Sequence, residues 1–347
     1  MDCSEFTEVC SYYLDSDENV AADDYFQCLI CDADPGDVIK IDRRIYYLDG
    51  LVPANPSDTN RLIRIDKAIT IDFNGSEIRF RDLTPVSGEG AKLWNKGFGV
   101  FPVVPREEFP RIVFRNGLFI GDETTSSLDQ YKVNYAGVLT SFSGVQIGQF
   151  LIEDCVFRNL SAGVAFNAYK SDANDPADSG YIRQAILRNC TFENIVVDET
   201  VTDNEGDNNR GRAATFQMQV DKDIDSHAFS LGNTFRKCER HSLYVFSGGP
   251  FLSEGDTFYD GSDGRHGWPA RLKWEDAVAA IALKGGTGGK VETQTDAFQG
   301  GSHMRISNAY FENCRDCINL SRATPEYPPG VTIQKFFDVS ITDCKFV

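Results

Sequence analysis

Short strands that alternate apolar and polar residues recur along the chain, and one motif follows each of them. Two examples are Phe150-Leu151-Ile152-Glu153 and Ala185-Ile186-Leu187-Arg188. A period of two predicts a β-strand with one buried face. After each strand an Asn or Asp precedes a Phe by three residues; the pairs are Asn116 with Phe119, Asp154 with Phe157, Asn189 with Phe192, Asn308 with Phe311, and Asp343 with Phe346. Looser copies end at Phe235 and Phe258, with Gly232 and Gly255 in the first position. This recurrence predicts a repeated structural unit.

The spacing between copies varies, whereas the centre of the motif is retained. Such variation is typical of solenoid coils whose insertions protrude at corners. We therefore predict an all-β fold, a right-handed parallel β-helix, with equivalent Phe residues on neighbouring coils. Residues 1–36 are expected to form an N-terminal cap with a short amphipathic helix at about 19–31, and residues 37–347 the β-helix, with insertions near 83–110, 197–212 and 284–301.

An asparagine position extends the repeat. Asn159, Asn194 and Asn313 each follow the motif Phe by two residues. At the turn of a parallel coil, an Asn tolerates the tight backbone and can hydrogen-bond the equivalent Asn about 4.8 Å away, one strand spacing along. We therefore expect these residues to form a ladder.

The cysteines also share repeat positions. One set is Cys155, Cys190 and Cys344, and a second is Cys238 and Cys314. A free cysteine packs like a small apolar residue, so stacks in the core are expected rather than disulfides. Four N-terminal cysteines have the ligand type of a zinc site, but their irregular spacing disfavours it, and no metal site is predicted. They are Cys3, Cys10, Cys28 and Cys31.

The charge and hydropathy of the chain argue against two classes of partner, nucleic acids and membranes. The chain has 347 residues and a net charge of −18, which disfavours general binding to nucleic acid or to anionic membranes. No apolar run is long enough to insert into a membrane, and the start Met1-Asp2-Cys3-Ser4-Glu5 lacks the features of a signal peptide. The expected location is extracellular or on a virion surface, reached without a signal peptide in this sequence.

The chain resembles the pectate lyase-like superfamily of right-handed β-helices, which includes polysaccharide lyases, glycoside hydrolases, alginate epimerases and phage tailspikes. The resemblance rests on the predicted helix before Gly36-Asp37-Val38-Ile39-Lys40-Ile41, the Asn/Asp-x-x-Phe-x-Asn coils and the cysteine stacks. It implies a polysaccharide partner and, for a tailspike, a homotrimer or larger assembly. Arg265-His266-Gly267 and Arg271-Leu272-Lys273 echo two motifs of pectin hydrolases but lie only a few residues apart, so the resemblance assigns them no catalytic role.

A polar column is expected on the second strand of each coil. These strands are predicted at 164–167, 215–218, 243–246, 271–274 and 318–320. Alternation turns six side chains outward along adjacent coils; they are Asn167, Gln217, Tyr244, Arg271, Lys273 and Asn319. The insertions at 197–212 and 284–301 would wall this column. Further substrate-binding candidates beside it are Arg240, Arg265, His266 and Trp268.

Two reactions fit these residues. In β-elimination, Arg271 or Lys273 neutralises a uronate carboxylate, His241 or Lys273 removes the α proton, and Tyr244 protonates the leaving oxygen. In hydrolysis, paired carboxylates flank the glycosidic bond; their candidates are Asp221, Asp223, Glu275 and Asp276. The local basic residues favour a lyase. The sequence assigns no definite cofactor; the acidic stretch 203–207 is expected to be solvated surface, with calcium binding as the alternative.

The same side chains also have ordinary structural interpretations. Tyr244 suits a half-buried strand, His241 and His266 suit turns, and Arg271 and Lys273 suit solvated strand positions. We therefore expect a polysaccharide-binding and polysaccharide-degrading β-helix, a lyase or hydrolase acting on an acidic glycan, with a phage tailspike as one setting. The alternative is a non-catalytic virion or cell-surface protein with a receptor-binding or structural role.

Overall fold

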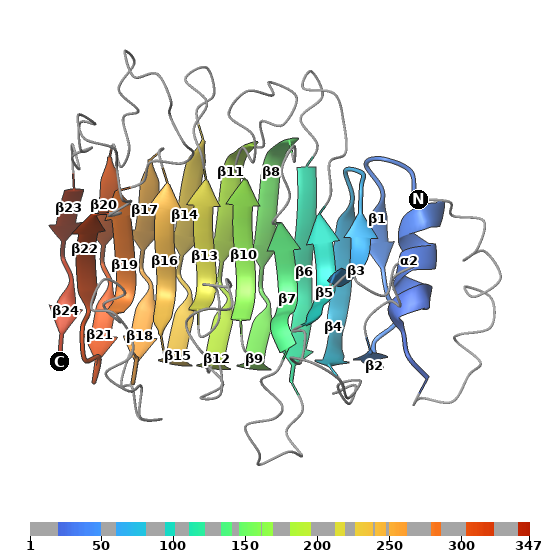
Figure 1. Ribbon diagram of the computed structural model, residues 1–347, viewed down its shortest axis with the longest axis horizontal. Coiled ribbons are helices and arrows are strands. Elements are labelled where there is room, and N and C mark those ends of the chain that lie inside the picture. Colours follow the sequence, from blue (N-terminus) through green and yellow to red (C-terminus); the bar gives the residue numbers. More distant parts are fainter. Residues whose placement is uncertain are drawn as a thin grey trace, which may run out of the picture.

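The computed structural model describes residues 20–49, 60–80, 94–100, 111–121, 133–140, 146–160, 162–168, 181–195, 212–218, 226–238, 240–247, 250–261, 279–285, 303–322 and 339–347. These residues form one helix, α2 (Asp23–Asp32), and two long sheets whose strands all pair in parallel (Figure 1). Strands from successive repeats lie side by side in register, so the chain is a parallel β-solenoid, as the repeat predicts.

Sheet A has sixteen strands in two limbs. The first limb runs through β8, β11, β14, β17, β20 and β23, and the second through β9, β12, β15, β18, β21 and β24. The limbs join because β6 pairs with both β8 and β9. The strands are β1 (Val38–Lys40), β2 (Ile45–Leu48), β4 (Thr70–Phe80), β6 (Arg111–Ile120), β8 (Gln146–Glu153), β9 (Val156–Leu160), β11 (Tyr181–Arg188), β12 (Thr191–Ile195), β14 (His227–Leu231), β15 (Thr234–Cys238), β17 (Phe251–Glu254), β18 (Thr257–Tyr259), β20 (Met304–Ser307), β21 (Tyr310–Glu312), β23 (Val339–Thr342) and β24 (Lys345–Phe346).

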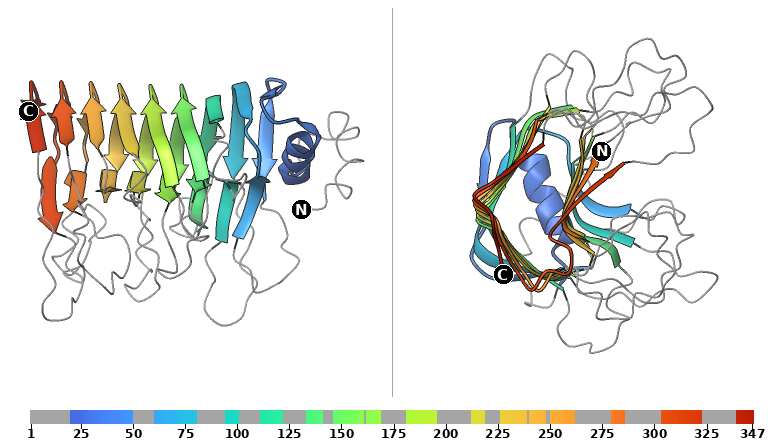
Figure 2. Two further views of the ribbon diagram at one scale, coloured as in Figure 1. Left: turned by 90° about the horizontal axis from the view of Figure 1, so that it is seen from above. Right: turned by 90° about the vertical axis from the view of Figure 1, so that its left-hand side faces the viewer.

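Sheet B has eight strands and lies across the core from sheet A (Figure 2). They are β3 (Asn60–Ile65), β5 (Trp94–Val100), β7 (Val133–Thr140), β10 (Ala162–Ala168), β13 (Arg212–Met218), β16 (His241–Ser247), β19 (Ala279–Gly285) and β22 (Ile318–Arg322). Within the predicted insertion at 83–110, Trp94–Val100 is therefore a strand that pairs with β3 and β7, and this part of the prediction is wrong.

The motif Asn or Asp makes the corner between the two limbs. Asp154, Asn189 and Asn308 have φ angles of 52°, 52° and 53°, in the left-handed region that Asn and Asp enter most readily after glycine. Gly232 and Gly255 take the same conformation in the looser copies. The short corner residue thus turns the chain from one limb into the other at each rung.

The predicted asparagine ladder is confirmed at the next corner for Asn159 and Asn194, but not for Asn313. The side-chain amide of Asn194 donates a hydrogen bond of 2.7 Å to Oδ1 of Asn159. Asn313 donates instead to Oδ1 of Asp260, at 3.3 Å, because Asp260 occupies this corner on the preceding rung. All four residues have positive φ angles.

The motif phenylalanines stack through the core as predicted. Ring centroids lie 4.8 Å apart between Phe119 and Phe157, 4.9 Å between Phe157 and Phe192, and 5.1 Å between Phe192 and Phe235. The column continues through Phe258 and Phe311 to Phe346. This spacing follows the strand separation, so the rings mark consecutive rungs.

The cysteines divide into two groups. Cys155, Cys190 and Cys238 are buried and free, and Cys314 and Cys344 are half-buried and free, which confirms the predicted stacks. Cys28 and Cys31 of α2, however, are both disulfide-bonded, so core packing does not describe the N-terminal set. A thiol held in a disulfide is not a zinc ligand, which removes these two from the four-cysteine zinc alternative.

Helix α2 closes the N-terminal end of the solenoid, as Figures 1 and 2 show. The ring of Phe26 lies 5.1 Å from Tyr46 and 5.3 Å from Phe98, inside the first rungs of the solenoid. Gln27 bonds both backbone groups of Arg64 in β3: its amide donates to the carbonyl at 3.1 Å and its carbonyl accepts from the N–H at 2.8 Å. The helix therefore satisfies a sheet edge that would otherwise be open.

A row of glycines crosses sheet B. Gly97, Gly137 and Gly163 lie next to one another on β5, β7 and β10. A Cβ atom on Gly97 would clash with the carbonyl oxygen of Gly137, and one on Gly137 with that of Gly163. Gly97 and Gly137 also have φ angles of +112° and +150°, which L-residues rarely adopt.

Candidate functional site

The register of sheet B orders the predicted polar column into two rows. Asn167 and Gln217 are partners in one row. Tyr244 lies two residues back, where the aligned positions are Ala165, Thr215, Tyr244, Ala282 and Asn319. The prediction of a single polar column is therefore wrong, because Asn167 and Gln217 lie in one row and Tyr244 and Asn319 in another. The side chains of Asn167 and Gln217 lie outside the described part of the structure.

The rung after Tyr244 differs from the prediction. Strand β19, not residues 271–274, pairs with β16, and Ala282 stands opposite Tyr244. The rung beside Tyr244 on this side is therefore β19, and no described residue tests the prediction for Arg271 and Lys273. These two residues, with Arg265, His266 and Trp268, lie outside the described residues. The apolar run that forms β19, Ala279 to Leu283, is buried on both faces and so shows no alternation.

Four polar or aromatic side chains gather where β13 and β16 begin. The guanidinium carbon of Arg212 lies 3.6 Å from the ring centroid of Tyr244, and the His241 ring lies 5.5 Å from the same ring. Arg212 and His241 are aligned in register, and Arg240 immediately precedes His241. We call Arg212, Arg240, His241 and Tyr244 the sheet B cluster. The structure thus places His241 and Arg212 against the ring of Tyr244, with Arg240 adjacent to His241 in the sequence.

The sheet B cluster is buried. Arg212 exposes 2% of its surface, Arg240 5%, His241 none and Tyr244 8%. Nδ1 of His241 lies 3.1 Å from the carbonyl oxygen of Ala279 on the next rung, which accepts a hydrogen bond when Nδ1 carries the proton. Burying a guanidinium is costly even when it is paired. Buried guanidiniums need partners within the protein, and the ring of Tyr244 is one such partner for Arg212.

Arg212 was missed because it is the last residue of the predicted insertion at 197–212. Its signal in the sequence is the segment that follows, Ala213-Ala214-Thr215-Phe216, whose small residues pack against the core. Asn319, by contrast, is half-buried at the C-terminal end of the Tyr244 row. It is the predicted substrate-binding residue whose side chain the structure describes as reachable by solvent.

The outer face of the first limb carries regular polar ladders in its N-terminal half. Arg115 bonds Asp72 at 3.1 Å, and Arg188 pairs with Glu153 one rung further on. In a parallel row, Nε of Arg111 donates to Gln149 at 2.7 Å and Gln149 donates to Gln184 at 2.8 Å. These ladders lie on either side of an apolar row in which Val113 and Leu151 are buried.

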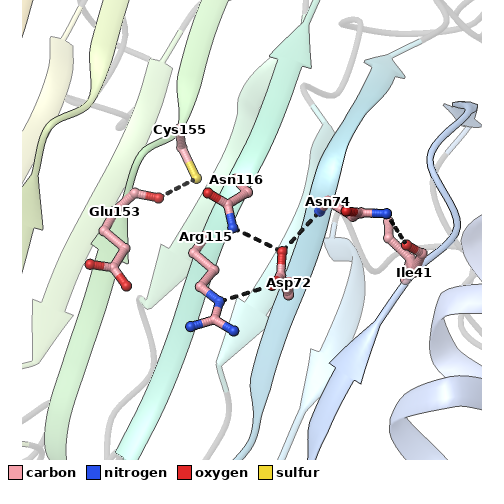
Figure 3. Close-up of polar contacts among 7 residues, drawn as sticks. All are labelled: Ile41, Asp72, Asn74, Arg115, Asn116, Glu153 and Cys155. Carbon is pink, nitrogen blue, oxygen red and sulfur yellow. Dashed lines mark hydrogen bonds and ion pairs between the residues drawn. The ribbon is translucent and has the colours of Figure 1, made fainter.

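Asp72 lies at the centre of one such group (Figure 3). Burial alone would raise the pKa of this carboxyl. Hydrogen bonds from the Asn116 side chain at 2.9 Å and the Asn74 backbone at 3.0 Å, together with Arg115, outweigh burial and hold the pKa below its usual value. Asp72 is therefore an ionised structural residue.

A second buried carboxyl lies inside the solenoid. Asn233 and Asp256 each follow a corner glycine, at the repeat position that Cys155 and Cys190 hold in earlier rungs. The backbone N–H of Asn233 donates to Oδ1 of Asp256 at 2.7 Å, and the Ser253 hydroxyl donates to Oδ2 at 2.6 Å. Burial raises the pKa of Asp256 to about 6, although these hydrogen bonds oppose the shift.

Among the residues that the structure describes, no group of His, Cys, Asp and Glu could hold a metal ion. The predicted calcium alternative at 203–207 lies outside those residues. Within the described ranges, α2 is too short to span a membrane, and no helix there meets the length and hydropathy of a span.

Comparison with known proteins gives no relative for this chain. No protein-family model matches it, and neither a characterised protein nor a solved structure shows significant similarity.

Proposed function

We propose that the protein binds an acidic polysaccharide on sheet B. The observation that carries the proposal is the sheet B cluster, in which the guanidinium of Arg212 lies on the ring of Tyr244 beside Arg240 and His241. This concentration of cationic side chains contrasts with a net charge of −18 for the chain. A local positive field suits the carboxylates of an acidic glycan.

The solenoid supports this proposal through its repetition. Equivalent positions recur on adjacent strands about 4.8 Å apart, so a row of side chains can follow an extended polymer. The row of Tyr244 ends at the half-buried Asn319, which offers an amide to a sugar hydroxyl. The disulfide-bonded Cys28 and Cys31 favour an oxidising, extracellular setting, where such polymers occur.

A lyase reaction is the second candidate. The specific observation that favours it is the contact of His241, Tyr244 and Arg212, since these types supply a base, an acid and a cation for β-elimination. Glycan binding is preferred to a lyase reaction because elimination requires His241 and Tyr244 to touch the substrate, whereas His241 has no exposed surface and Tyr244 has little. The proposal covers both a tailspike-like trimer that degrades its glycan and a receptor-binding protein without catalysis. The two differ in whether glycosidic bonds are cleaved after binding.

The test measures binding and cleavage separately. The protein is titrated calorimetrically with bacterial and algal polysaccharides, and the mixtures are followed for ultraviolet absorbance of unsaturated ends and for new reducing ends. We expect Arg212→Gln to weaken binding of an acidic glycan at least tenfold. Arg111→Gln, which removes the same charge from the other sheet, is the matched control and should bind as the parent protein does.

Tyr244→Phe separates the two candidates. The variant keeps the ring that Arg212 covers but lacks the hydroxyl, so it should bind normally and lose elimination if the second candidate holds. A folded Arg212→Gln protein with undiminished binding would remove the sheet B cluster as the site.

A further inference from the structure

The outer face of the first limb changes character after β11. In β6, β8 and β11, polar ladders lie on either side of an apolar row. From β14 onward this apolar row continues with Phe229 and Leu252, which are half-buried, and then meets Arg305. Before β17 stands Pro250, which has no side-chain hydrogen-bonding group to extend a ladder.

A depression of about 390 Å³ lies on this face, between β14, β17, β20 and β23. Phe229, Pro250 and Leu252 supply its apolar lining, and Glu254, His303 and Arg305 supply its polar groups. Its volume falls in the range of small-molecule sites, and its composition is of the kind they use: an apolar lining with a few convergent polar groups.

The charges of the depression differ from those of the N-terminal ladders. Arg115 and Arg188 are held in ion pairs with Asp72 and Glu153. Among the described residues, Arg305 and Glu254 form no such pair, and both are exposed. A guanidinium of this kind can bind a carboxylate through two parallel hydrogen bonds, without first breaking an internal pair.

We propose that this depression is a second glycan site, which binds an acidic pyranose unit. The apolar face of the sugar ring lies on Phe229 and Leu252, its carboxylate accepts hydrogen bonds from Arg305, and its hydroxyls donate to Glu254. An acidic sugar is favoured because it has a group for each kind of surface: an apolar ring face for Phe229 and Leu252, a carboxylate for Arg305 and hydroxyl donors for Glu254. The site lies on sheet A, so it does not rest on the proposed function of sheet B.

The test uses calorimetry on the full chain with oligogalacturonate, alginate oligosaccharides and hyaluronan oligosaccharides as probes. We expect at least one acidic probe to bind, and its affinity to fall at least tenfold in Arg305→Gln and in Phe229→Ala. The same probe after reduction of its carboxyl groups should bind the parent protein as weakly. Arg111→Gln is the matched control, because it removes an exposed arginine from the same face outside the depression.

The outcomes separate the two sites. Loss of binding in Arg305→Gln with retention in Arg212→Gln supports the depression and not sheet B. Loss in Arg212→Gln with unchanged binding in Arg305→Gln overturns the second site and leaves the first. Failure of every acidic probe, or a change of molar mass on sedimentation in place of a change in affinity, also overturns it, the latter because the face would then join copies of the chain.

Discussion

The rungs up to β12 and the rungs from β14 onward have the same backbone arrangement. They differ in which residues fill the core next to the corner and in how charged side chains on the outer face are paired. In the N-terminal half, the corner cysteines Cys155 and Cys190 fill the core, and Arg115 and Arg188 on the outer face are held in ion pairs. In the C-terminal half, Asn233 and Asp256 take the core position, and Arg305 and Glu254 beside the depression form no ion pair with another described residue. The corners and the phenylalanine column specify the fold in both halves. The faces are therefore free to differ, and function is best sought where they do.

The largest expected effect tests what the halves share. Phe157→Ala in the N-terminal half and Phe258→Ala in the C-terminal half should each lower the free energy of unfolding by about 4 kcal/mol, because both rings are fully buried. Chemical denaturation measures this. Phe346→Ala, at a half-exposed ring, is the control and should cost less. A Phe258→Ala loss under half that of Phe157→Ala would show that the column stabilises the halves unequally.

A slightly smaller effect concerns the interior of the C-terminal half. The folded pKa of Asp256, about 6, exceeds the ordinary aspartate pKa of 3.8, so the folded state binds the proton more tightly. This stabilisation is complete below the unfolded pKa and is lost as pH rises to about 6; the shift corresponds to about 3 kcal/mol. Asp256→Asn imitates the protonated acid and should remove this dependence. Unfolding of both proteins between pH 4 and pH 7 gives the difference, and parallel curves would contradict the prediction.

Asp72 should show the opposite sign in the N-terminal half. Its pKa is lowered, so its stabilisation is present above the unfolded pKa and is lost as pH falls through the folded pKa. Asp72→Asn should cost about 2 kcal/mol at neutral pH, because charge-assisted hydrogen bonds are lost. The gap between parent and variant should close on acidification. A gap that widens in acid would mean that Asp72 does not act as an ionised acceptor.

The smallest expected effect lies on the surface ladder. Arg188→Gln removes an exposed ion pair with Glu153, and such pairs contribute about 0.5 kcal/mol or less. The measured change should shrink further in high salt. A loss above about 1 kcal/mol would show that the ladders of the N-terminal half stabilise the solenoid as a connected network.

Much of the fold was predictable, because its main signals are local. The spacing of Asn189 and Phe192 repeats in several copies, and each copy places a corner and a core ring. Strand β5 was missed because its sequence, Trp94-Asn95-Lys96-Gly97-Phe98-Gly99-Val100, lacks the motif and is rich in glycine. The strand of this rung was predicted at Arg271-Leu272-Lys273-Trp274 because that segment alternates, whereas the strand that pairs with β16 begins with five apolar residues, Ala279 to Leu283.

Less of the candidate site was predictable. Alternation placed Tyr244 correctly on its strand and next to His241, but its burial depends on neighbours from other rungs, such as Arg212. The depression on sheet A arises from Phe229, Leu252 and Arg305, which come from three repeats and have no shared motif. Contacts between repeats cannot be inferred from any one segment of the sequence. The burial of Tyr244 and the depression could therefore be recognised only once the strand register was known.

The glycine row of sheet B places positions that cannot tolerate substitution side by side in space although they are far apart in the sequence. Gly97, Gly137 and Gly163 are remote from one another in sequence, yet each lies against the carbonyl oxygen of the next, so none has room for a methyl group. A saturation scan would therefore show intolerant positions as stripes that cross the molecule along its long axis. Between the stripes, the lengths of the connecting loops set how far apart in the gene these positions fall.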